Sequence, residues 1–416
     1  MSSRGQIEHL FRHEYGQLVA LLVRRFGFEH FEQVEDAVQW AMAQALDTWL
    51  KQAVPDKPSA WLYQVALRYL LSQFRQQQSH SNLLAQTEEP QTEVLVEPPL
   101  SGELSDALLR MLFVASDEAL AVESQLVFTL KSLVGFSIKE TALRLFISEA
   151  NAYKRFSRAR KYLQQQPLQL DSLNEQDMQR RLPAVYRVLY LLFTEGYLSS
   201  HEDLSIRQDL CEEAIRLTGL LSQHALGNRP ESYALLALMY LNTARLPARQ
   251  QAGELLLLQE QDRSSWNQAQ IAMGLLCLQR SAQGDQLSRY HIEAGIAAEH
   301  CLASSFEQTR WHKIVEAYQL LEKLAPSPFH ILNRAVALAQ WQGAKVGLTE
   351  LESSQVPSWL SRSYHWYAVL ADLQFRSGEQ KLAEQNAQLA LEQAPSATIR
   401  RLLSKRWRLV APEDSA

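Results

Sequence analysis

Five polar side chains recur at helical spacing between residues 151 and 161, and together they could bind a nucleic acid. Residues three and four apart lie on one face of an α-helix, so these side chains share a side. Cations neutralise phosphates, and polar groups near the start of a recognition helix can reach base edges in the major groove. We predict that Asn151 and Lys154 read bases. The predicted phosphate contacts are Arg155, Arg158, Arg160 and Lys161.

Two short helices are predicted to position this face. Ser137 and Glu140 form an S-x-x-E capping box, which predicts a helix from Ile138. Ser148 is a good N-cap for a second helix. The inward stripe of that helix is predicted to be Ala152, Phe156, Ala159 and Leu163. Two helices joined by a short turn are typical of a helix-turn-helix, although a solvated basic face on a helical hairpin would leave the same pattern.

The charge distribution supports a basic module beside an acidic connector. The whole chain has a net charge of −5, yet residues 121–163 carry 8 basic and 3 acidic side chains. Residues 76–120 carry 1 basic and 8 acidic side chains. The segment 81–104 is rich in Glu, Pro and Ser, so it is predicted to be a solvated acidic linker.

The composition of the 416 residues, rich in Leu, Ala, Gln and Glu and sparse in Gly, predicts an all-α protein. Its three cysteines have no CxxC spacing, which indicates buried thiols in a reducing compartment. The chain shows no signal peptide and no apolar run long enough for a bilayer, so we expect a cytoplasmic protein without a membrane. No motif for a metal, a cofactor or catalysis is present, so we expect no enzyme.

Two N-terminal helices are predicted to carry further surfaces. The first, through Val34 to Trp49, is amphipathic, and its outer side is suited to binding a protein. That outer side comprises Asp36, Gln39, Trp40 and Asp47. Trp40 packing on a neighbouring helix is the alternative. The second helix is predicted to begin at a Ser59 cap.

The second N-terminal helix carries an aromatic residue and two arginines on one side. Trp61, Arg68 and Arg75 could stack on bases and pair with phosphates of single-stranded DNA. The alternative places Trp61 in the core and leaves the arginines in solvent.

The C-terminal third is predicted to contain tetratricopeptide (TPR) repeats. From Tyr364 to Pro395 the small residues and the final proline fit the 34-residue TPR template. Gly343 precedes Gly378 by 35 residues, as a repeat requires. We expect two to three TPR-like units with a concave face for a protein or peptide ligand, after a less regular helical region.

The segment "ISEANAYKRFSRARKYL" resembles the recognition helix in region 4 of bacterial sigma factors. Their pattern V-x-x-R-L-x-R-A-R-x-x-L is matched by Arg155, Arg158, Ala159, Arg160 and Leu163, while Ala152 and Phe156 replace the usual Val and Leu. "LVALLVRRFGFEHFEQVEDAVQWAMAQAL" and "PDKPSAWLYQVA" resemble region 2 of extracytoplasmic-function (ECF) sigma factors. The resemblance implies promoter DNA and core RNA polymerase as partners, through the β′ clamp helices and the β flap.

Region 4 of the family contacts the −35 promoter element, and the helix after the W-L pair opens the −10 element. There the family pattern is A-R-N-x-x-x-D-x-x-R, and this chain keeps only the last arginine, Arg75. Arg68 and Ser72 stand at the Asn and Asp positions.

Segments such as "LYLLFTEGYLSS" and "LEKLAPSPFHILNRAVALA" resemble the ECF subgroup with a long helical, TPR-containing extension, which implies control through that extension. The predicted order is a region 2-like domain at 1–80, the linker at 81–104, a region 4-like domain at 105–166, a helical extension at 167–300 and TPR-like repeats at 301–416. We interpret the chain as a sigma factor. One alternative is a TPR adaptor whose sigma-like half binds polymerase or another protein without opening promoters. Another is a repressor that uses the helix-turn-helix alone.

Overall fold

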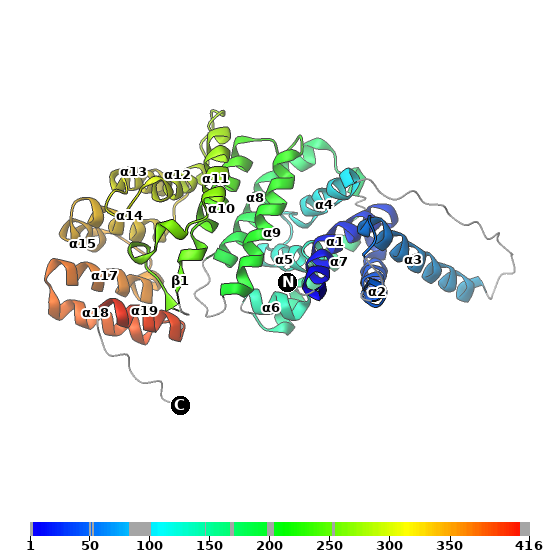
Figure 1. Ribbon diagram of the computed structural model, residues 1–416, viewed down its shortest axis with the longest axis horizontal. Helices are drawn as coiled ribbons and strands as arrows, with labels where there is room; N and C mark the ends of the chain where they lie inside the picture. The colour runs from blue at the N-terminus through cyan, green and yellow to red at the C-terminus, as the bar shows by residue number, and fades with distance from the viewer. Residues whose placement is uncertain are drawn as a thin grey trace. The chain divides into compact units, whose positions relative to one another are not determined.

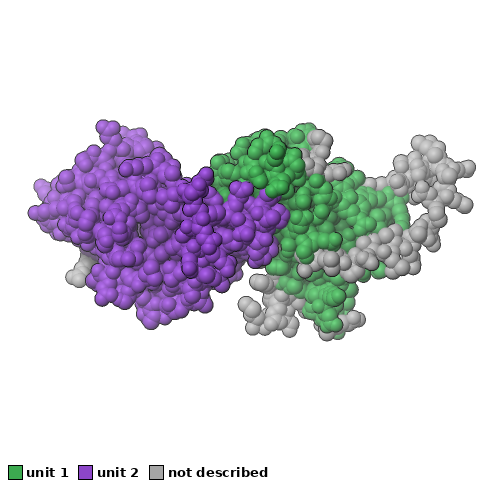
Figure 2. All heavy atoms as spheres, turned by 90° about the horizontal axis from the view of Figure 1, so that it is seen from above, with its two compact units in different colours: residues 1–192 green, residues 193–416 purple. Residues whose placement is uncertain are grey.

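The computed structural model describes residues 3–49, 51, 54–82, 101–145, 147–166, 170–197, 204–251 and 254–407. Nearly all regular structure in these residues is helical, which confirms the all-α prediction (Figure 1). The chain divides into two compact units, residues 1–192 and residues 193–416, which are coloured separately in Figure 2. Most of the predicted linker, residues 83–100, lies outside the described residues. The finer division into five segments stays a prediction.

Unit 1 is built from eight α-helices within the described residues. They are α1 (Ser3–Phe26), α2 (Phe31–Trp49), α3 (Pro58–Asn82), α4 (Ser101–Ala115), α5 (Val122–Phe128), α6 (Ile138–Leu145), α7 (Glu149–Gln165) and α8 (Glu175–Tyr197). A π-helical turn, η2 (Thr129–Leu133), follows α5, and the last residues of α8 belong to unit 2. The amphipathic helices bury their apolar sides against one another, as their 3.6-residue periodicity requires.

Helix α1 approaches the η2 turn so closely that only glycine fits at the contact. A Cβ atom on Gly16 would lie 1.9 Å from the carbonyl oxygen of Leu133, inside any permitted contact. Gly135, just after this turn, has φ of +83°, a conformation that glycine adopts without strain. The N-terminal helices and the segment that leads to α6 therefore form one tightly packed unit.

Unit 2 continues as helices with one small irregular region. After α9 (Leu204–Gln223) and α10 (Pro230–Thr243) come β1 (Gln250–Gln251) and β2 (Glu254–Leu255), which pair antiparallel. The later helices are α11 (Gln268–Ser281), α12 (Arg289–Leu302), α13 (Trp311–Leu324), α14 (Pro328–Trp341), α15 (Ala344–Ser353), α16 (Ser358–Ser361), α17 (Tyr364–Ser377), α18 (Gln380–Glu392) and α19 (Ala397–Trp407). The β pair is a feature that the helical composition does not predict.

Helices α17 and α18 form a hairpin where the repeat template is matched. Gly378 ends α17 in the left-handed conformation, with φ of +84°, and the small residues Ala371, Ala383 and Ala390 are fully buried. An earlier hairpin, α14 and α15, also meets through small residues, because a Cβ on Gly347 would lie 2.5 Å from the Ala335 carbonyl oxygen. In each hairpin two consecutive helices are joined by a short turn, as in the predicted repeats. Their assignment as TPR units stays a prediction.

The start of α3 differs from the prediction. The helix begins at Pro58 rather than after a Ser59 cap, and the Trp61 amide donates to the Lys57 carbonyl at 3.2 Å. Proline suits the first helical position because its fixed φ is helical and its missing N–H needs no partner there. The proline, and not the serine that follows it, marks the beginning of this helix.

Candidate nucleic-acid interface

The helical hairpin α6–α7 is held by the two caps that the sequence predicts. The Ser137 amide donates to Glu140 Oε2 at 2.8 Å, and the Glu140 amide donates to Ser137 Oγ at 3.1 Å. Ser148 Oγ accepts a hydrogen bond from the Asn151 amide at 3.2 Å, so α7 begins at Glu149. Both predicted helix starts are therefore confirmed.

The two sides of α7 differ sharply in burial. The predicted inward stripe, Ala152, Phe156, Ala159 and Leu163, is buried. Asn151, Lys154, Arg158 and Lys161 are exposed, and Arg155 is half-buried. No ion pair joins Lys154, Arg155, Arg158 or Lys161 to a carboxylate in the described part of the chain. We call these four cations, with Asn151, the α7 outer face. Its charge is available to an external anion such as a nucleic-acid phosphate.

Arg160 does not belong to the α7 outer face, and its role as a phosphate contact stays a prediction. Its guanidinium pairs with Glu32 at 2.5 Å and lies 5.8 Å from the centre of the Phe156 ring. The reason is helical geometry: Arg160 follows Phe156 by four residues and so shares the buried side. Glu32 precedes it by more than a hundred residues, so the local pattern gave no sign of this partner.

An aromatic cluster links α7 to the start of α2. The rings of Phe31, Phe128 and Phe156 lie within 5.6 to 6.4 Å of one another, measured between centroids. Phe31 and Phe128 are fully buried, and Phe156 is 4% exposed. We call this the phenylalanine cluster. It fixes the inner side of α7 against the N-terminal helices.

Beside the phenylalanine cluster lies a buried polar triad that local patterns did not reveal. Lys131 Nζ pairs with Glu35 Oε1 at 2.8 Å, and the Tyr15 hydroxyl donates to the same oxygen at 2.8 Å. Burial, together with the negative charge of Glu35, raises the pKa of Tyr15 well above its ordinary value. One signal was present in the sequence, because Glu35 lies four residues after Phe31 on the buried side of its helix.

Helix α3 keeps its arginines exposed but not its tryptophan. Arg68 and Arg75 lie in solvent, whereas Trp61 is half-buried against Trp49, with ring centroids 5.3 Å apart. This packing matches the alternative in which Trp61 contributes to the core. A cationic strip remains on α3, and the stacking role of Trp61 stays a prediction.

The predicted protein-binding side of α2 is on the surface. Asp36, Gln39, Trp40 and Asp47 are all exposed. Trp40 is 40% exposed while it stacks on Tyr69 of α3, at 4.8 Å between ring centroids. Both readings of Trp40 therefore hold in part: one ring face packs within the domain, and the rest of the ring is open to a partner.

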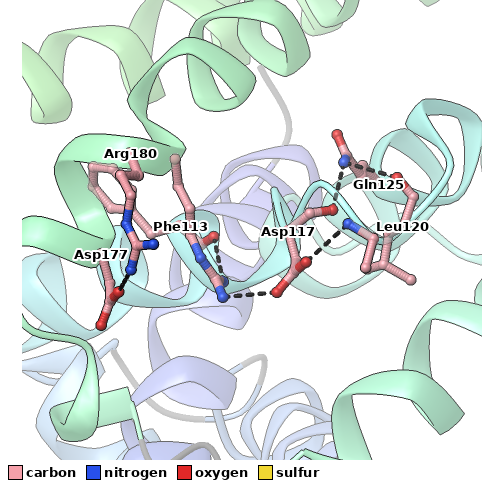
Figure 3. Close-up of polar contacts among 8 residues, drawn as sticks. Phe113, Asp117, Leu120, Gln125, Asp177 and Arg180 are labelled. Atoms are coloured by element: carbon pink, nitrogen blue, oxygen red, sulfur yellow. Dashed lines mark hydrogen bonds and ion pairs between the residues drawn. The ribbon is translucent and has the colours of Figure 1, made fainter.

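Helix α8 is tied to the turn before α5 by Arg181. Its guanidinium donates to the Phe113 carbonyl at 3.2 Å and to Asp117 Oδ2 at 2.7 Å (Figure 3). Burial and the negative charge of Asp117 raise the pKa of Tyr162 on α7. One carboxylate thus bonds α8 and acts electrostatically on α7, a connection that sequence reasoning missed.

The described residues hold no metal cluster and no membrane-spanning helix. Among the described residues, no group of three or more acidic, His or Cys side chains could hold a metal ion. None of the described helices combines the length and the apolar character needed to cross a bilayer.

Three stretches of the chain match known protein families. Residues 10–80 match the family described as sigma-70 region 2, and residues 118–163 match the family described as sigma-70, region 4. Residues 181–282 match a family of unknown function, DUF6596. The chain is 32% identical over 358 residues to an uncharacterized protein of Rhizobium meliloti (strain 1021). The aligned residues make up 85% of this chain and 84% of that protein. No solved structure matches the chain.

Proposed function

Because the chain belongs to the sigma-70 family, as an ECF-type sigma factor with a C-terminal extension, we propose that α7 contacts −35 promoter DNA and that the extension controls this contact. A sigma factor binds core RNA polymerase for promoter recognition, and both partners lie in the bacterial cytoplasm, where we infer that this protein works. It acts in this role by binding rather than by catalysis.

The observation that carries the −35 assignment is the α7 outer face. Its cations have no carboxylate partner among the described residues, while the opposite side of the same helix is buried. Asn151 and Lys154 lie in the first turns of α7, which is the part of a recognition helix that enters the major groove. Arg155, Arg158 and Lys161 lie further along and suit the phosphates.

The salt dependence of DNA binding tests this assignment. Replacing Lys154 and Arg158 by Ala should weaken binding to a −35 duplex and lower the slope of log affinity against log salt by about 2, about 1 for each lost phosphate contact. Lys381→Ala, an exposed lysine in α18, is the matched control and should leave the slope unchanged. An unaltered slope in the double variant would remove α7 from the interface.

We assign the polymerase contact to the exposed side of α2. Trp40 offers a half-open aromatic surface among Asp36, Gln39 and Asp47, which suits a basic helical partner such as the β′ clamp helices. Trp40→Ala should weaken binding to core polymerase at least tenfold. Trp359→Ala removes a tryptophan that is 56% exposed on unit 2 and should have no such effect. Equal affinities of the two variants would rule the α2 side out.

Unit 1 as described cannot reach both promoter elements at once. The −35 and −10 elements are about 25 base pairs apart, which is about 85 Å of duplex. A compact unit of 192 residues has a radius of gyration of only about 16 Å. The arrangement held by the phenylalanine cluster and the Tyr15–Glu35–Lys131 triad is therefore a closed form, and promoter binding requires α7 to separate from α1 and α2.

Control by the extension has a physical route through α8. Arg181 on this helix bonds Asp117, and the charge of Asp117 acts on Tyr162 of the recognition helix. A displacement of α8 that moves Asp117 would therefore alter the surroundings of α7. Asp117→Asn should weaken this link and change transcription on a selected promoter severalfold. Asp177→Asn is the matched control, because the ion-pair partner of Asp177 among the described residues is Arg180 of the same helix (Figure 3).

The adaptor alternative rests on α3. Arg68 and Ser72 occupy the positions where the family pattern has Asn and Asp, and Trp61 is packed against Trp49. Transcription in vitro with core polymerase, on promoters selected from a random library, separates the two functions. Defined transcripts support a sigma factor, whereas binding to core without any transcript supports the adaptor.

A further inference from the structure

Unit 2 contains two adjoining cavities that no assigned function uses. The larger, of about 230 Å³, lies between α14, α17, α19 and the turn around Leu258. The smaller, of about 190 Å³, lies between α12, α13 and α14. Four residues line both cavities: Leu258, Phe306, Val336 and Gln340. A ligand at this shared wall would lie between α12 and α13 on one hand and α17 and α19 on the other.

The walls are mostly apolar and aromatic, and their charges are already paired. Asp372 and Arg406 are the charged residues that line the larger cavity, and their side chains bond each other at 2.8 Å. Phe306 and Trp311 meet edge to face, with centroids 5.1 Å apart. An apolar cavity of about 150 Å³ binds benzene, so each of these cavities has room for an aromatic ring.

His300 lines the smaller cavity, together with the polar residues Tyr318, Asn333 and Gln340. The Nδ1 atom of His300 is shielded from solvent and has no hydrogen-bond partner among the described residues. Burial, with Arg245 and Arg263 nearby, lowers the pKa of His300 to about 3, so the imidazole is neutral at neutral pH. Its ring meets Trp311 at 5.4 Å, which fixes its orientation. A neutral ring nitrogen without a partner favours a ligand that brings a hydroxyl or carbonyl group.

A charged ligand is disfavoured by the same walls. The Arg263 guanidinium donates to the carbonyl oxygens of His300 and Ala303, at 2.5 and 2.7 Å. Neither Arg263 nor Arg245 is among the residues that line the two cavities. An ionised group would lose its hydration without gaining an unpaired counter-charge among the lining residues. We propose that these cavities bind a small, neutral aromatic molecule with one hydrogen-bonding group, which contacts His300 and packs on Val336.

Direct binding to the full-length chain tests this site without polymerase or DNA, so the result does not depend on the sigma function. The probes are 2-naphthol, naphthalene and 2-naphthoate. Their binding is detected by saturation-transfer NMR, and their relative affinities are measured by competition between them. We expect 2-naphthol to bind more tightly than the other two probes. Absence of 2-naphthol binding up to its solubility limit would overturn the proposal, and tighter binding of 2-naphthoate would overturn its neutral-ligand part.

Three substitutions locate the binding within the cavities. Val336→Trp fills the shared wall and should weaken 2-naphthol at least tenfold, whereas Val346→Trp on α15, where Val346 is 40% exposed, should not. His300→Phe keeps a ring but removes the nitrogen, so it should weaken 2-naphthol about fivefold and leave naphthalene unchanged. Ala368→Phe fills the larger cavity from α17 and replaces Val336→Trp if circular dichroism shows that variant unfolded. Wild-type affinity in a folded cavity-filling variant would place the probe elsewhere and refute the site.

Discussion

Residues 1–80 and 101–166 meet in unit 1 through a buried ion pair, an Arg160–Glu32 contact, three phenylalanine rings and the close approach of α1 to η2 at Gly16. The α14–α15 hairpin of unit 2 instead packs through Gly347 and alanines beside a core of leucines and Trp366. Polar groups can exchange their partners for water or for another protein when two surfaces separate. Close packing of small residues leaves a void if its helices move apart. The polar pairs of unit 1 therefore favour its separation more than the apolar packing of the α14–α15 hairpin does, and the Gly16 contact opposes that separation.

The largest effect expected from this comparison is at Lys131. Lys131→Met leaves the buried Glu35 carboxylate without its cation, which should cost about 3 to 5 kcal/mol of unfolding free energy. Thermal unfolding should show the transition of unit 1 lowered by about 6 to 15 °C. The double variant Lys131→Met with Glu35→Leu should recover most of this loss. A single variant as stable as the wild type would mean that the triad does not hold unit 1 closed.

A substitution at Gly16 tests the close contact between α1 and the Leu133 carbonyl of η2. Alanine favours a helix over glycine by about 1 kcal/mol, so Gly16→Ala would stabilise α1 if nothing lay beside it. Because the new Cβ would meet the Leu133 carbonyl, we expect a loss of about 2 kcal/mol instead. Gly219→Ala in α9 has open space and should raise stability, as measured by denaturant unfolding. A stabilised Gly16→Ala variant would contradict the packing of α1 on η2.

Unit 2 should respond to acid through His300. The pKa of His300 is lowered to about 3 in the folded chain, so the unfolded chain binds a proton at this residue more readily than the folded chain does. The unfolding free energy is therefore highest at pH values above the ordinary histidine pKa and falls as the pH drops below it. Between pH 7 and pH 5 the unfolding free energy of unit 2 should fall by about 1 to 2 kcal/mol on this account. His300→Phe should remove that part of the pH dependence. An unchanged pH profile in this variant would show that His300 titrates normally in the folded chain.

The smallest effect on stability is expected on the α7 outer face. The Lys154→Ala and Arg158→Ala changes remove exposed cations that have no carboxylate partner among the described residues, so the unfolding free energy should change by less than about 0.5 kcal/mol. Circular dichroism during thermal unfolding is the measurement. A large loss would mean that these cations stabilise the fold, and it would weaken their assignment to DNA.

Local patterns predicted the features that depend on neighbours in the sequence. The caps at Ser137 and Ser148 and the buried stripe of α7 follow from spacings of three and four residues, and the structure confirms them. The exposure of Trp40 on α2 followed from the same periodicity. The helical spacing placed Trp61 on the same side of α3 as Arg68 and Arg75, but it did not predict that the ring packs against Trp49.

Partners distant in the sequence could not be predicted in the same way. The ion pair of Arg160 could not be predicted because the pattern of α7 contains no information on Glu32. The pairing of Glu35 with Lys131 depends on packing between helices that lie nearly a hundred residues apart. Composition likewise gave no sign of the β1–β2 pair, which arises from an irregular segment between α10 and α11.

Phe156 has a consequence for how long an opened chain could persist in a cell. The family pattern has Leu at this position, whereas the phenyl ring here reaches both Phe31 and Phe128. Separating α7 from α2 would present these rings to water, and such a chain would self-associate or be degraded unless another surface received them. The same ring that braces the recognition helix thereby shortens the lifetime of any copy that opens without polymerase at hand.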